Sequence, residues 1–372
     1  MPLVAHSRLP SFSRLREAGL EVLDSERAAQ QDVRELHVGL LNMMPDAALE
    51  ATERQFMRLM GSCNRIAQFY VHPFTIAGVD RAGSAAEHVR EYYEDFRDLQ
   101  RDGLDALIIT GANVTEADIT KERFWGPMTE VMDWASENIT STLCSCLASH
   151  GAFMHYHGIL RTHLAQKQWG VYSHRIVDHS HPLLSNINTR FDTPHSRFND
   201  VRREQMEDAG LRVLIASEQA GVLLAVSADG LRFAYFQGHP EYDIVSLMKE
   251  YKREIGRYVR RERDDYPPYP DNYFCDEAIS ILEDYKRDLL AAEARGAGIP
   301  EYPESEIVAL LDNTWTDTGK ALFNNWLGLV YQLTNRDRRL PFMQDIDPSD
   351  PLGIRGSADK SESAPRDTAL QR

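Results

Sequence analysis

Cys146 stands where a thiol can become a nucleophile. The preceding segment, residues 141–145, is short and rich in β-forming residues, and small residues with helical spacing follow it. A cysteine at such a junction lies on the turn between a strand and a helix, where free backbone N–H groups and the helix dipole stabilise a thiolate. Taken alone, this stretch fits a buried, unreactive cysteine better, because free cysteine is among the most frequently buried residue types.

A histidine and a glutamate occupy a second junction of the same kind, at residues 238–243. His239 follows a predicted strand and precedes a predicted helix, so in a parallel sheet it reaches the same edge as Cys146. Glu241 can hold the second imidazole nitrogen. A carboxylate that orients a base, and a base that faces a thiol, form the triad of an activated nucleophile. Each of the two residues alone also fits a helix cap or a first-turn acid, but the combination favours the triad.

The elements that must position these residues alternate along the first half of the chain. Strands are expected at 36–44, 66–71, 104–112 and 140–145, and helices at 47–60, 88–101 and 124–136, with Asp46 as the cap of the first helix. This alternation predicts a doubly wound, mostly parallel α/β sheet with its ligand site beyond the carboxyl ends of the strands. Shorter strands are expected at 169–177, 211–217, 221–227 and 231–237, the last two forming a hairpin.

The chain divides into four predicted parts. Residues 1–34 are expected to form an N-terminal arm, and residues 35–263 the α/β domain that carries the candidate triad and ends in a helix at 242–263. Residues 264–340 are expected to form a C-terminal helical region packed on that domain, with helices at 277–295 and 318–333. Residues 341–372 lack a periodic apolar pattern, which predicts a disordered tail.

Composition limits the class of protein. The chain has 372 residues, a formal net charge of −16 and four cysteines, Cys63, Cys144, Cys146 and Cys275. Their number and spacing fit neither a disulfide framework nor a common zinc motif, so a reducing cytoplasm and no metal are expected. An acidic protein argues against nucleic-acid binding. The chain has no apolar run of about 18 residues, so no membrane span is expected. Residues 1–20 include basic residues but no apolar core segment, so no secretory signal is expected.

The order Cys146, His239, Glu241 resembles the class I glutamine amidotransferase-like fold, a flavodoxin-like arrangement whose enzymes cleave the amide of glutamine. The nucleophile of that family usually lies in a Gly-x-Cys-x-Gly turn. In this chain Cys144 and Ala148 occupy the two positions where that family has glycine. Their presence favours a relative of the fold that uses a different acyl donor.

Several separated motifs carry a closer resemblance, which covers residues 1–340. They are Leu41-Asn42-Met43-Met44-Pro45, Thr52-Glu53-Arg54-Gln55-Phe56, Thr110-Gly111-Ala112, Ser141-Thr142-Leu143 up to Cys146, Gly170-Val171-Tyr172, Pro194-His195-Ser196-Arg197, Gly238 to Asp243 and Phe323-Asn324-Asn325-Trp326-Leu327. In this order they resemble the homoserine O-succinyltransferase family, acyl-CoA-dependent enzymes at the start of methionine biosynthesis.

The resemblance implies a ping-pong reaction in which Cys146 forms an acyl-thioester, His239 acts as general base and Glu241 supports it. L-homoserine and an acyl-CoA are the implied substrates, with no bound cofactor and no metal. Three further residues fall where the family binds substrate: Lys167, Ser196 and Arg253. The family also tends to form homodimers. Arg253 lies in a basic run, residues 252–263, whose members Arg257 and Arg260 are candidates to bind the phosphates of coenzyme A.

Thr115 falls at the position where the residue found in the family differs with the acyl donor. The family has glycine at this position with succinyl-CoA and glutamate with acetyl-CoA. Threonine is neither residue, but it lacks the negative charge that would repel succinate, which favours succinyl-CoA. The alternatives are an O-acetyltransferase, serine in place of homoserine as acceptor, a glutamine amidotransferase-like hydrolase and a non-catalytic binding protein on the same fold. Cys144, two residues before the nucleophile, is expected in the core.

Overall fold

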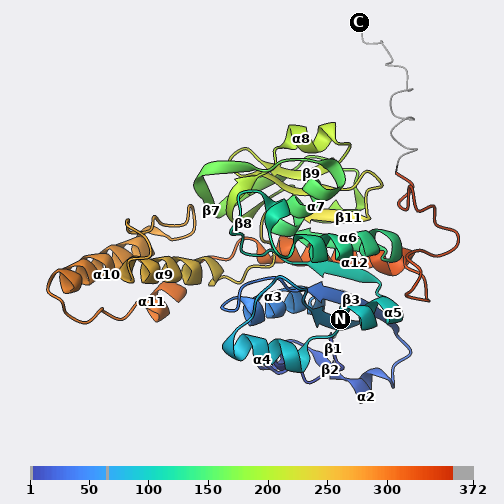
Figure 1. Ribbon diagram of the computed structural model, residues 1–372, viewed down its shortest axis with the longest axis horizontal. Coiled ribbons are helices and arrows are strands. Elements are labelled where there is room, and N and C mark those ends of the chain that lie inside the picture. The colour runs from blue at the N-terminus through green and yellow to red at the C-terminus, as the bar shows by residue number, and fades with distance from the viewer. Residues whose placement is uncertain (1–2, 64–66, 355–372) are drawn as a thin grey trace, which may run out of the picture.

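The computed structural model describes residues 3–63 and 67–354, and its ribbon is shown in Figure 1. One mixed sheet runs through the described residues in the order β2-β1-β4-β3-β5-β6-β11-β10-β9-β7-β8. Its strands are β1 Leu3–Ala5, β2 Val22–Asp24, β3 Arg34–Leu41, β4 Ala67–Phe74, β5 Ala106–Ile109, β6 Ser141–Ser145, β7 Thr162–Ile176, β8 Arg190–Asp200, β9 Arg212–Ser217, β10 Gly221–Val226 and β11 Phe233–Phe236.

From β2 to β11 each neighbouring pair of strands is parallel, and from β11 to β8 each pair is antiparallel. The prediction of a doubly wound, mostly parallel α/β sheet is therefore confirmed, as is the hairpin of β10 and β11. The helices are α1 Pro10–Glu17, α2 Ser25–Ala28, α3 Leu49–Gly61, α4 Gly83–Tyr92, α5 Phe96–Asp102, α6 Trp125–Asn138, α7 Leu147–His157, α8 Arg203–Asp208, α9 Ser246–Val259, α10 Asp276–Ala294, α11 Glu304–Val308 and α12 Thr316–Leu333, with 3-10 turns η1 Ile119–Lys121 and η2 Pro182–Leu184.

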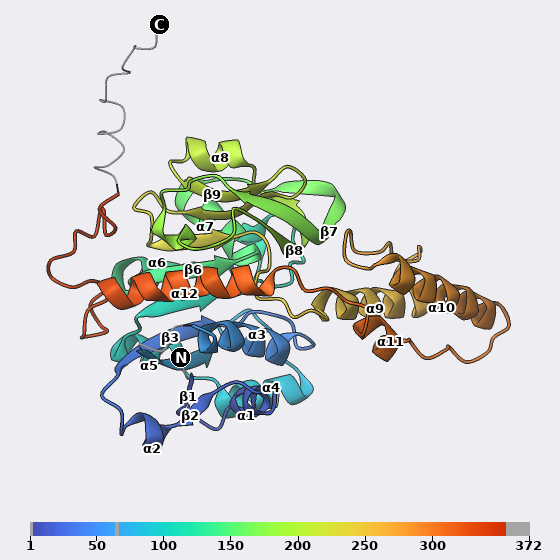
Figure 2. The ribbon, with the colours of Figure 1, turned by 180° about the vertical axis from the view of Figure 1, so that it is seen from behind.

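Two apolar cores lie on the two faces of the sheet. Alternate side chains of β3, such as Leu36 and Leu40, pack against α1, α3 and α12, while Leu41 packs with α5, α6 and α7 on the opposite face. Figure 2 shows α12 crossing the sheet with α3 beside it. Cys144 is fully buried in the second core, which confirms its predicted place. Because helices pack on both faces of the sheet, the carboxyl ends of the parallel strands are held in place at one edge.

A helical lobe projects from one end of the sheet (Figure 1). Its core joins α9, α10 and α11 through Tyr251, Leu282 and Ile307. The region 264–340 was predicted as one helical unit, but the structure places its helices in two locations. α10 and α11 pack on α9, whereas α12 returns to the sheet because its apolar stripe, with Phe323 and Trp326, fills the first core.

Both ends of the described chain join the body of the molecule. Residues 1–34, expected as an arm, contribute β1 and β2 to the sheet, and Leu3 of β1 lies in register with Phe69 of β4. Of the predicted tail, residues 341–354 are described, and Phe342 is buried against Leu231 and Leu333. The prediction of disorder is wrong there, and for 355–372 it lies outside the described residues.

Three local predictions differ from the structure. The helix expected at 88–101 is two helices, because Asp95 accepts the N–H of Arg97 at 2.8 Å and caps a new start for α5. Asp46 does not cap α3, which begins at Leu49; its carboxylate accepts the N–H of Ala82 at 3.0 Å instead. The sequence reading also missed β8, an edge strand with few apolar residues. No helix of the described residues is long and apolar enough to cross a membrane.

Candidate active site

Cys146 is the single residue between β6 and α7, and its backbone is strained. Its φ of 51° and ψ of −108° are unusual for a residue with a side chain and cost on the order of 1–3 kcal/mol. The Cys146 N–H donates to the carbonyl of Phe236 at 2.7 Å, and its own carbonyl accepts the N–H of Ser149 at 3.0 Å. These bonds hold a sharp strand-to-helix turn that presents the thiol at the sheet edge.

His239 reaches this thiol from the neighbouring strand. β11 runs parallel to β6 with Phe236 beside Ser145, so the residues after both strands lie at the same edge. The imidazole forms a hydrogen bond with Cys146, and its Nδ1 lies 2.7 Å from Oε1 of Glu241. All three residues predicted as a triad therefore come together, with His239 and Glu241 buried.

The charge of His239 follows from its two neighbours. Burial by itself lowers the pKa of His239, but the charges of Glu241 and Cys146, with hydrogen bonds to both, outweigh burial and raise that pKa to about 10. The imidazole is therefore protonated at neutral pH and faces Cys146 as a cation. A thiolate–imidazolium pair is the form of cysteine that attacks carbonyl carbon.

Several contacts hold Glu241 in place. Arg58 of α3 donates from Nη2 to the Glu241 carbonyl at 3.0 Å and forms an ion pair with Asp243. Ser145 Oγ donates to Glu241 Oε1 at 3.4 Å. The ring of Tyr242 stacks on His239 with the centroids 4.3 Å apart. The imidazole is thus fixed by a carboxylate at one nitrogen and by an aromatic face.

The backbone beside Cys146 can stabilise an oxyanion. Leu147 begins α7, so its N–H has no acceptor within the helix and points to the helix N-terminus. A Cβ placed on Gly111, after β5, would lie 3.7 Å from the Cys146 Cβ and 3.9 Å from the Leu147 nitrogen. Gly111 therefore borders the space where a carbonyl oxygen of an acyl group would bind.

A buried carboxylate that the sequence reading missed links the substrate-binding candidates. Glu250 of α9 accepts hydrogen bonds from Lys167 Nζ at 3.0 Å, Ser196 Oγ at 2.7 Å and Tyr242 OH at 2.8 Å. Burial alone would raise the pKa of Glu250, but these three groups lower it below its ordinary value. Glu250 looks like an ordinary helix acid in sequence, and no pattern around it indicates these contacts.

Arg253 lies one turn after Glu250 on α9 and is exposed. Within the described residues no acidic group pairs with Arg253, while the other members of the basic run do have acidic partners. These pairs are Lys252–Glu304, Arg257–Glu254, Arg260–Glu262, Arg261–Glu293 and Arg263–Glu254. Arg253 is therefore the cation of this run that can bind a carboxylate without breaking an existing pair.

Thr115 lies in the loop between β5 and η1. The backbone N–H groups of Thr115 and Glu116 donate to Oε1 of Glu122 at 2.6 and 2.7 Å, which fixes the loop. The loop lines a cavity of about 400 Å³ together with Met43, Pro45, Ala112 and Lys121 among others.

Arg161, immediately before β7, is a second residue that the sequence did not indicate. Its Nη2 donates to the carbonyls of Glu116 and Ala117 at 3.3 and 3.2 Å, so it binds the loop that carries Thr115. Its Nε and Nη1 are buried and have no hydrogen-bond partner in the described part of the chain. Burial lowers the pKa of Arg161, while the charges of Glu122 and Cys146 act in the opposite direction. A cation with free donors thus lies within electrostatic range of the thiol.

These elements define a class of protein: an α/β protein with a Cys-His-Glu site at the carboxyl edge of its parallel strands, in which the cysteine is partly exposed and the other two residues are buried. A family model described as homoserine O-succinyltransferase matches residues 2–336. The chain belongs to this family and is an acyltransferase.

Relatives and solved structures resemble the chain to very different degrees. The homoserine O-succinyltransferases of Methylobacter tundripaludum and Methylococcus capsulatus are 59% and 60% identical, and each match covers 95% of this chain and 100% of the relative. A solved glutamine amido transferase from Methylobacillus flagellatus is 12% identical with a TM-score of 0.42, covering 80% of this chain and 95% of that one. A glutamine amidotransferase from Thermotoga maritima is 14% identical with a TM-score of 0.38, covering 81% and 98%.

Proposed function

We propose that this acyltransferase moves the succinyl group of succinyl-CoA to the hydroxyl of L-homoserine through a thioester on Cys146. The contact of Cys146 with the His239–Glu241 pair carries the proposal, because it supplies both a nucleophile and a proton carrier at one point. Membership of the family supplies the two substrates.

The first half-reaction forms the thioester. The Cys146 thiolate attacks the thioester carbon of the acyl-CoA, and the negative oxygen is held by the Leu147 N–H. When the bond to the CoA sulfur breaks, the His239 imidazolium gives its proton to that sulfur. Free coenzyme A leaves, and His239 becomes neutral while Glu241 keeps its orientation.

The second half-reaction transfers the acyl group. Neutral His239 accepts the proton of the homoserine hydroxyl, and the hydroxyl oxygen attacks the thioester on Cys146. The carbon–sulfur bond breaks and returns the thiolate beside the new imidazolium. Because each proton that His239 gives away is recovered in this step, the site returns to its starting charge.

The amino-acid acceptor fits the charged groups of β7, β8 and α9. We assign the α-carboxylate to Arg253, since Arg can bind a carboxylate with two parallel hydrogen bonds and Arg253 has no acidic partner among the described residues. Glu250, held by Lys167 and Ser196, supplies a negative charge for the α-ammonium group. We therefore assign these four residues to homoserine binding.

The free donors of Arg161 support succinyl-CoA as the acyl donor. A succinyl group carries a distal carboxylate, and Arg161 is a cation in electrostatic range of Cys146 with two unused N–H groups. Neutral Thr115, in the loop that Arg161 binds, adds no charge that would repel this carboxylate. An acetyl group has no distal carboxylate that Arg161 could bind.

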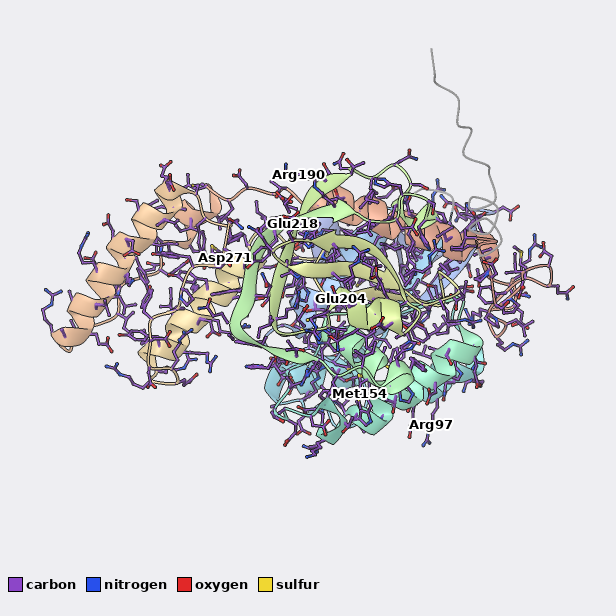
Figure 3. All side chains as sticks on the ribbon, turned by 90° about the horizontal axis from the view of Figure 1, so that it is seen from above. Arg97, Met154, Arg190, Glu204, Glu218 and Asp271 are labelled. Carbon is purple, nitrogen blue, oxygen red and sulfur yellow. The ribbon has the colours of Figure 1, made fainter. Side chains whose placement is uncertain are left out.

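The nucleotide end of the acyl-CoA needs a basic surface. A cavity of about 730 Å³ at the start of β10 is lined by Arg175, Arg190, Arg202 and Arg203. Figure 3 labels Arg190 with Glu204 and Glu218, which also line it. The carbonyl of Val222 at this cavity accepts from Gln237, two residues before His239, at 3.1 Å. We assign the phosphates to this cavity rather than to Arg257 and Arg260, which both have acidic partners. Of the four cavity arginines, only Arg203 is paired with an acidic residue of the described chain, Glu207.

Three further parts of the proposal concern the state of the protein. We propose that the reaction needs no bound cofactor, that the enzyme acts in the cytoplasm and that it forms a homodimer, as the family resemblance implies. Light scattering after size-exclusion chromatography measures the molar mass of the protein directly. A monomer mass at micromolar concentration would contradict the homodimer.

A turnover assay separates the proposal from its alternatives. Release of coenzyme A is followed with succinyl-CoA or acetyl-CoA, and with L-homoserine or L-serine, while ammonia release is followed with glutamine. The proposal predicts the highest kcat/KM for succinyl-CoA with L-homoserine. A preference for acetyl-CoA or serine would change the substrate assignment, and ammonia release would favour an amidotransferase.

A further inference from the structure

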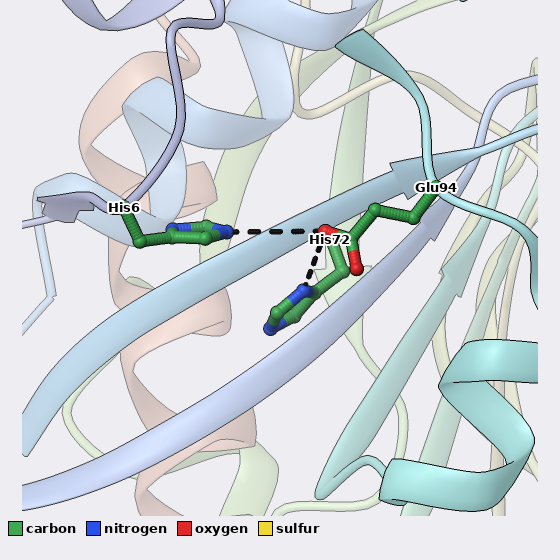
Figure 4. Close-up of side chains that lie close together, drawn as sticks. All are labelled: His6, His72 and Glu94. Atoms are coloured by element: carbon green, nitrogen blue, oxygen red, sulfur yellow. Dashed lines mark hydrogen bonds and ion pairs between the residues drawn. The ribbon is translucent and has the colours of Figure 1, made fainter.

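Two histidines and a glutamate converge on the half of the sheet that does not carry Cys146. His6 follows β1, His72 lies in β4, and Glu94 follows α4 and bridges to Phe74. Figure 4 shows the three side chains pointing toward one another. His72 Nδ1 lies 2.7 Å and His6 Nε2 4.0 Å from Glu94 Oε1, and one ligand atom from each residue falls within 4.8 Å of the others.

A backbone hydrogen bond orients one of the two histidines toward the cluster. His6 Nδ1 lies 3.1 Å from the carbonyl of Val4, which requires a proton on Nδ1; in the neutral imidazole, the form that binds metals, the lone pair is then on Nε2. That Nε2 is buried and has no hydrogen-bond partner among the residues described. A histidine whose other nitrogen donates to a backbone carbonyl is the usual arrangement of a metal ligand.

His72 has the same kind of support on its far side. Its Nε2 lies 2.9 Å from Nδ1 of His37, and Nε2 of His37 lies 3.5 Å from Glu35. Without a metal, His72 Nδ1 donates to Glu94 Oε1. A bound metal ion would replace that proton, and His72 could then donate from Nε2 to Nδ1 of His37. The ring of His37 also stacks on Tyr70, which fixes its orientation.

We propose that His6, His72 and Glu94 bind a divalent transition-metal ion, best Zn²⁺, with water as the remaining ligand. Two imidazole nitrogens and one carboxylate suit Zn²⁺, whereas Ca²⁺ and Mg²⁺ prefer oxygen ligands alone. As ligands, two imidazoles and one carboxylate together carry a single negative charge. The sequence predicts no metal here because the three ligands come from separate segments without a common spacing.

The proposed ion has a structural role and takes no part in the transfer reaction. β3 and β5 separate β4 from β6, so the cluster lies on a different part of the sheet from Cys146. β1 contacts β4 through a single register pair, Leu3 with Phe69. A metal that joins His6 to His72 therefore anchors the N-terminal strand to the sheet, independently of the proposed function.

Zinc binding to the full-length protein tests the proposal. The protein is freed of metal with a chelator and titrated with Zn²⁺ by calorimetry in a Cys146→Ser background, because the thiol–imidazole pair would also bind zinc. One equivalent of Zn²⁺ is expected. His6→Ala should weaken this binding by at least about tenfold, since even groups that only support the ligands contribute about 10- to 100-fold to affinity. Zn²⁺ should raise the Tm of the parent but not of His6→Ala.

A matched control uses a histidine–carboxylate pair on which no third ligand converges among the described residues. His155 Nε2 lies 2.7 Å from Asp133, the same distance as in the His72–Glu94 pair. His155→Ala should bind Zn²⁺ like the parent protein. If the parent binds no Zn²⁺, or if His6→Ala binds it unchanged, His6, His72 and Glu94 form only an ion pair and hydrogen bonds, and the proposal is wrong. With Cys146 present, removing Zn²⁺ should change kcat less than about twofold, so a failed transfer assay would count against the proposed function alone.

Discussion

Replacing Glu241 with glutamine removes the charge that orients and protonates His239 while keeping the shape of the side chain. Glu241 is 4% exposed and His239 6%, and Glu241 Oε1 lies 2.7 Å from His239 Nδ1. An opposite charge this close changes a pKa by about 1 to 3, which corresponds to about 1.4–4 kcal/mol. Glu241→Gln should therefore lower the pKa of His239 from about 10 and slow acylation of Cys146 by about 10- to 1000-fold.

The assay measures acylation directly. The protein is mixed with succinyl-CoA without homoserine, quenched at short times and weighed, and the rate of thioester formation is compared with that of Glu241→Gln. Asp133→Asn is the matched control, because it removes a carboxylate 2.7 Å from a histidine at the surface. If Glu241→Gln forms the thioester within about threefold of the parent rate, Glu241 does not support the catalytic base.

Three other changes test separate parts of the account. Gly238→Ala should destabilise the protein to urea by about 1–3 kcal/mol, because a Cβ there would lie 2.7 Å from Nε2 of buried His195; unchanged unfolding would show that the site has room. Arg161→Gln should raise KM for succinyl-CoA by about tenfold and leave KM for acetyl-CoA unchanged, and an equal effect on both donors would refute a carboxylate contact. The pKa of His239 is raised from 6.5 to about 10, so its stabilising contribution is complete below pH 6.5 and is lost as the pH rises through about 10. The free energy of unfolding in urea should therefore fall over this range more steeply in the parent than in Glu241→Gln. Parallel profiles would contradict the pairing of His239 with Glu241.

The sequence predicted the triad because chemistry and topology coincide there. Cys146 and His239 each follow a strand, and parallel strands bring the residues after their carboxyl ends to one edge. The strand pattern was strong enough to reveal both positions, and β6 and β11 are neighbours in the structure. The His–Glu spacing then indicated which carboxylate faces the imidazole.

Contacts between distant segments could not be predicted in this way. Glu250 has the surroundings of a surface helix acid in sequence, and only the folding of β7 and β8 against α9 brings Lys167 and Ser196 to it. The same holds for Arg161, whose partners are backbone carbonyls of a loop, and for His6, which reaches its cluster through β1.

Element boundaries failed where polar side chains redirect the backbone. Asp95 starts a new helix inside a region of continuous helical periodicity. β8 lies at the sheet edge and lacks the apolar alternation that marks strands with a buried face. The residues of α12 show a clear apolar stripe, but periodicity alone does not say which surface that stripe covers.

The central claim is that Cys146 carries the acyl group between the two substrates. The most direct measurement is the intact mass of the protein after incubation with succinyl-CoA alone, followed by peptide mapping. We predict one succinyl group on the peptide that contains Cys146, its loss as O-succinyl-L-homoserine when L-homoserine is added, and no adduct in Cys146→Ser. A succinyl adduct that persists in Cys146→Ser, or turnover in that variant, would contradict the account.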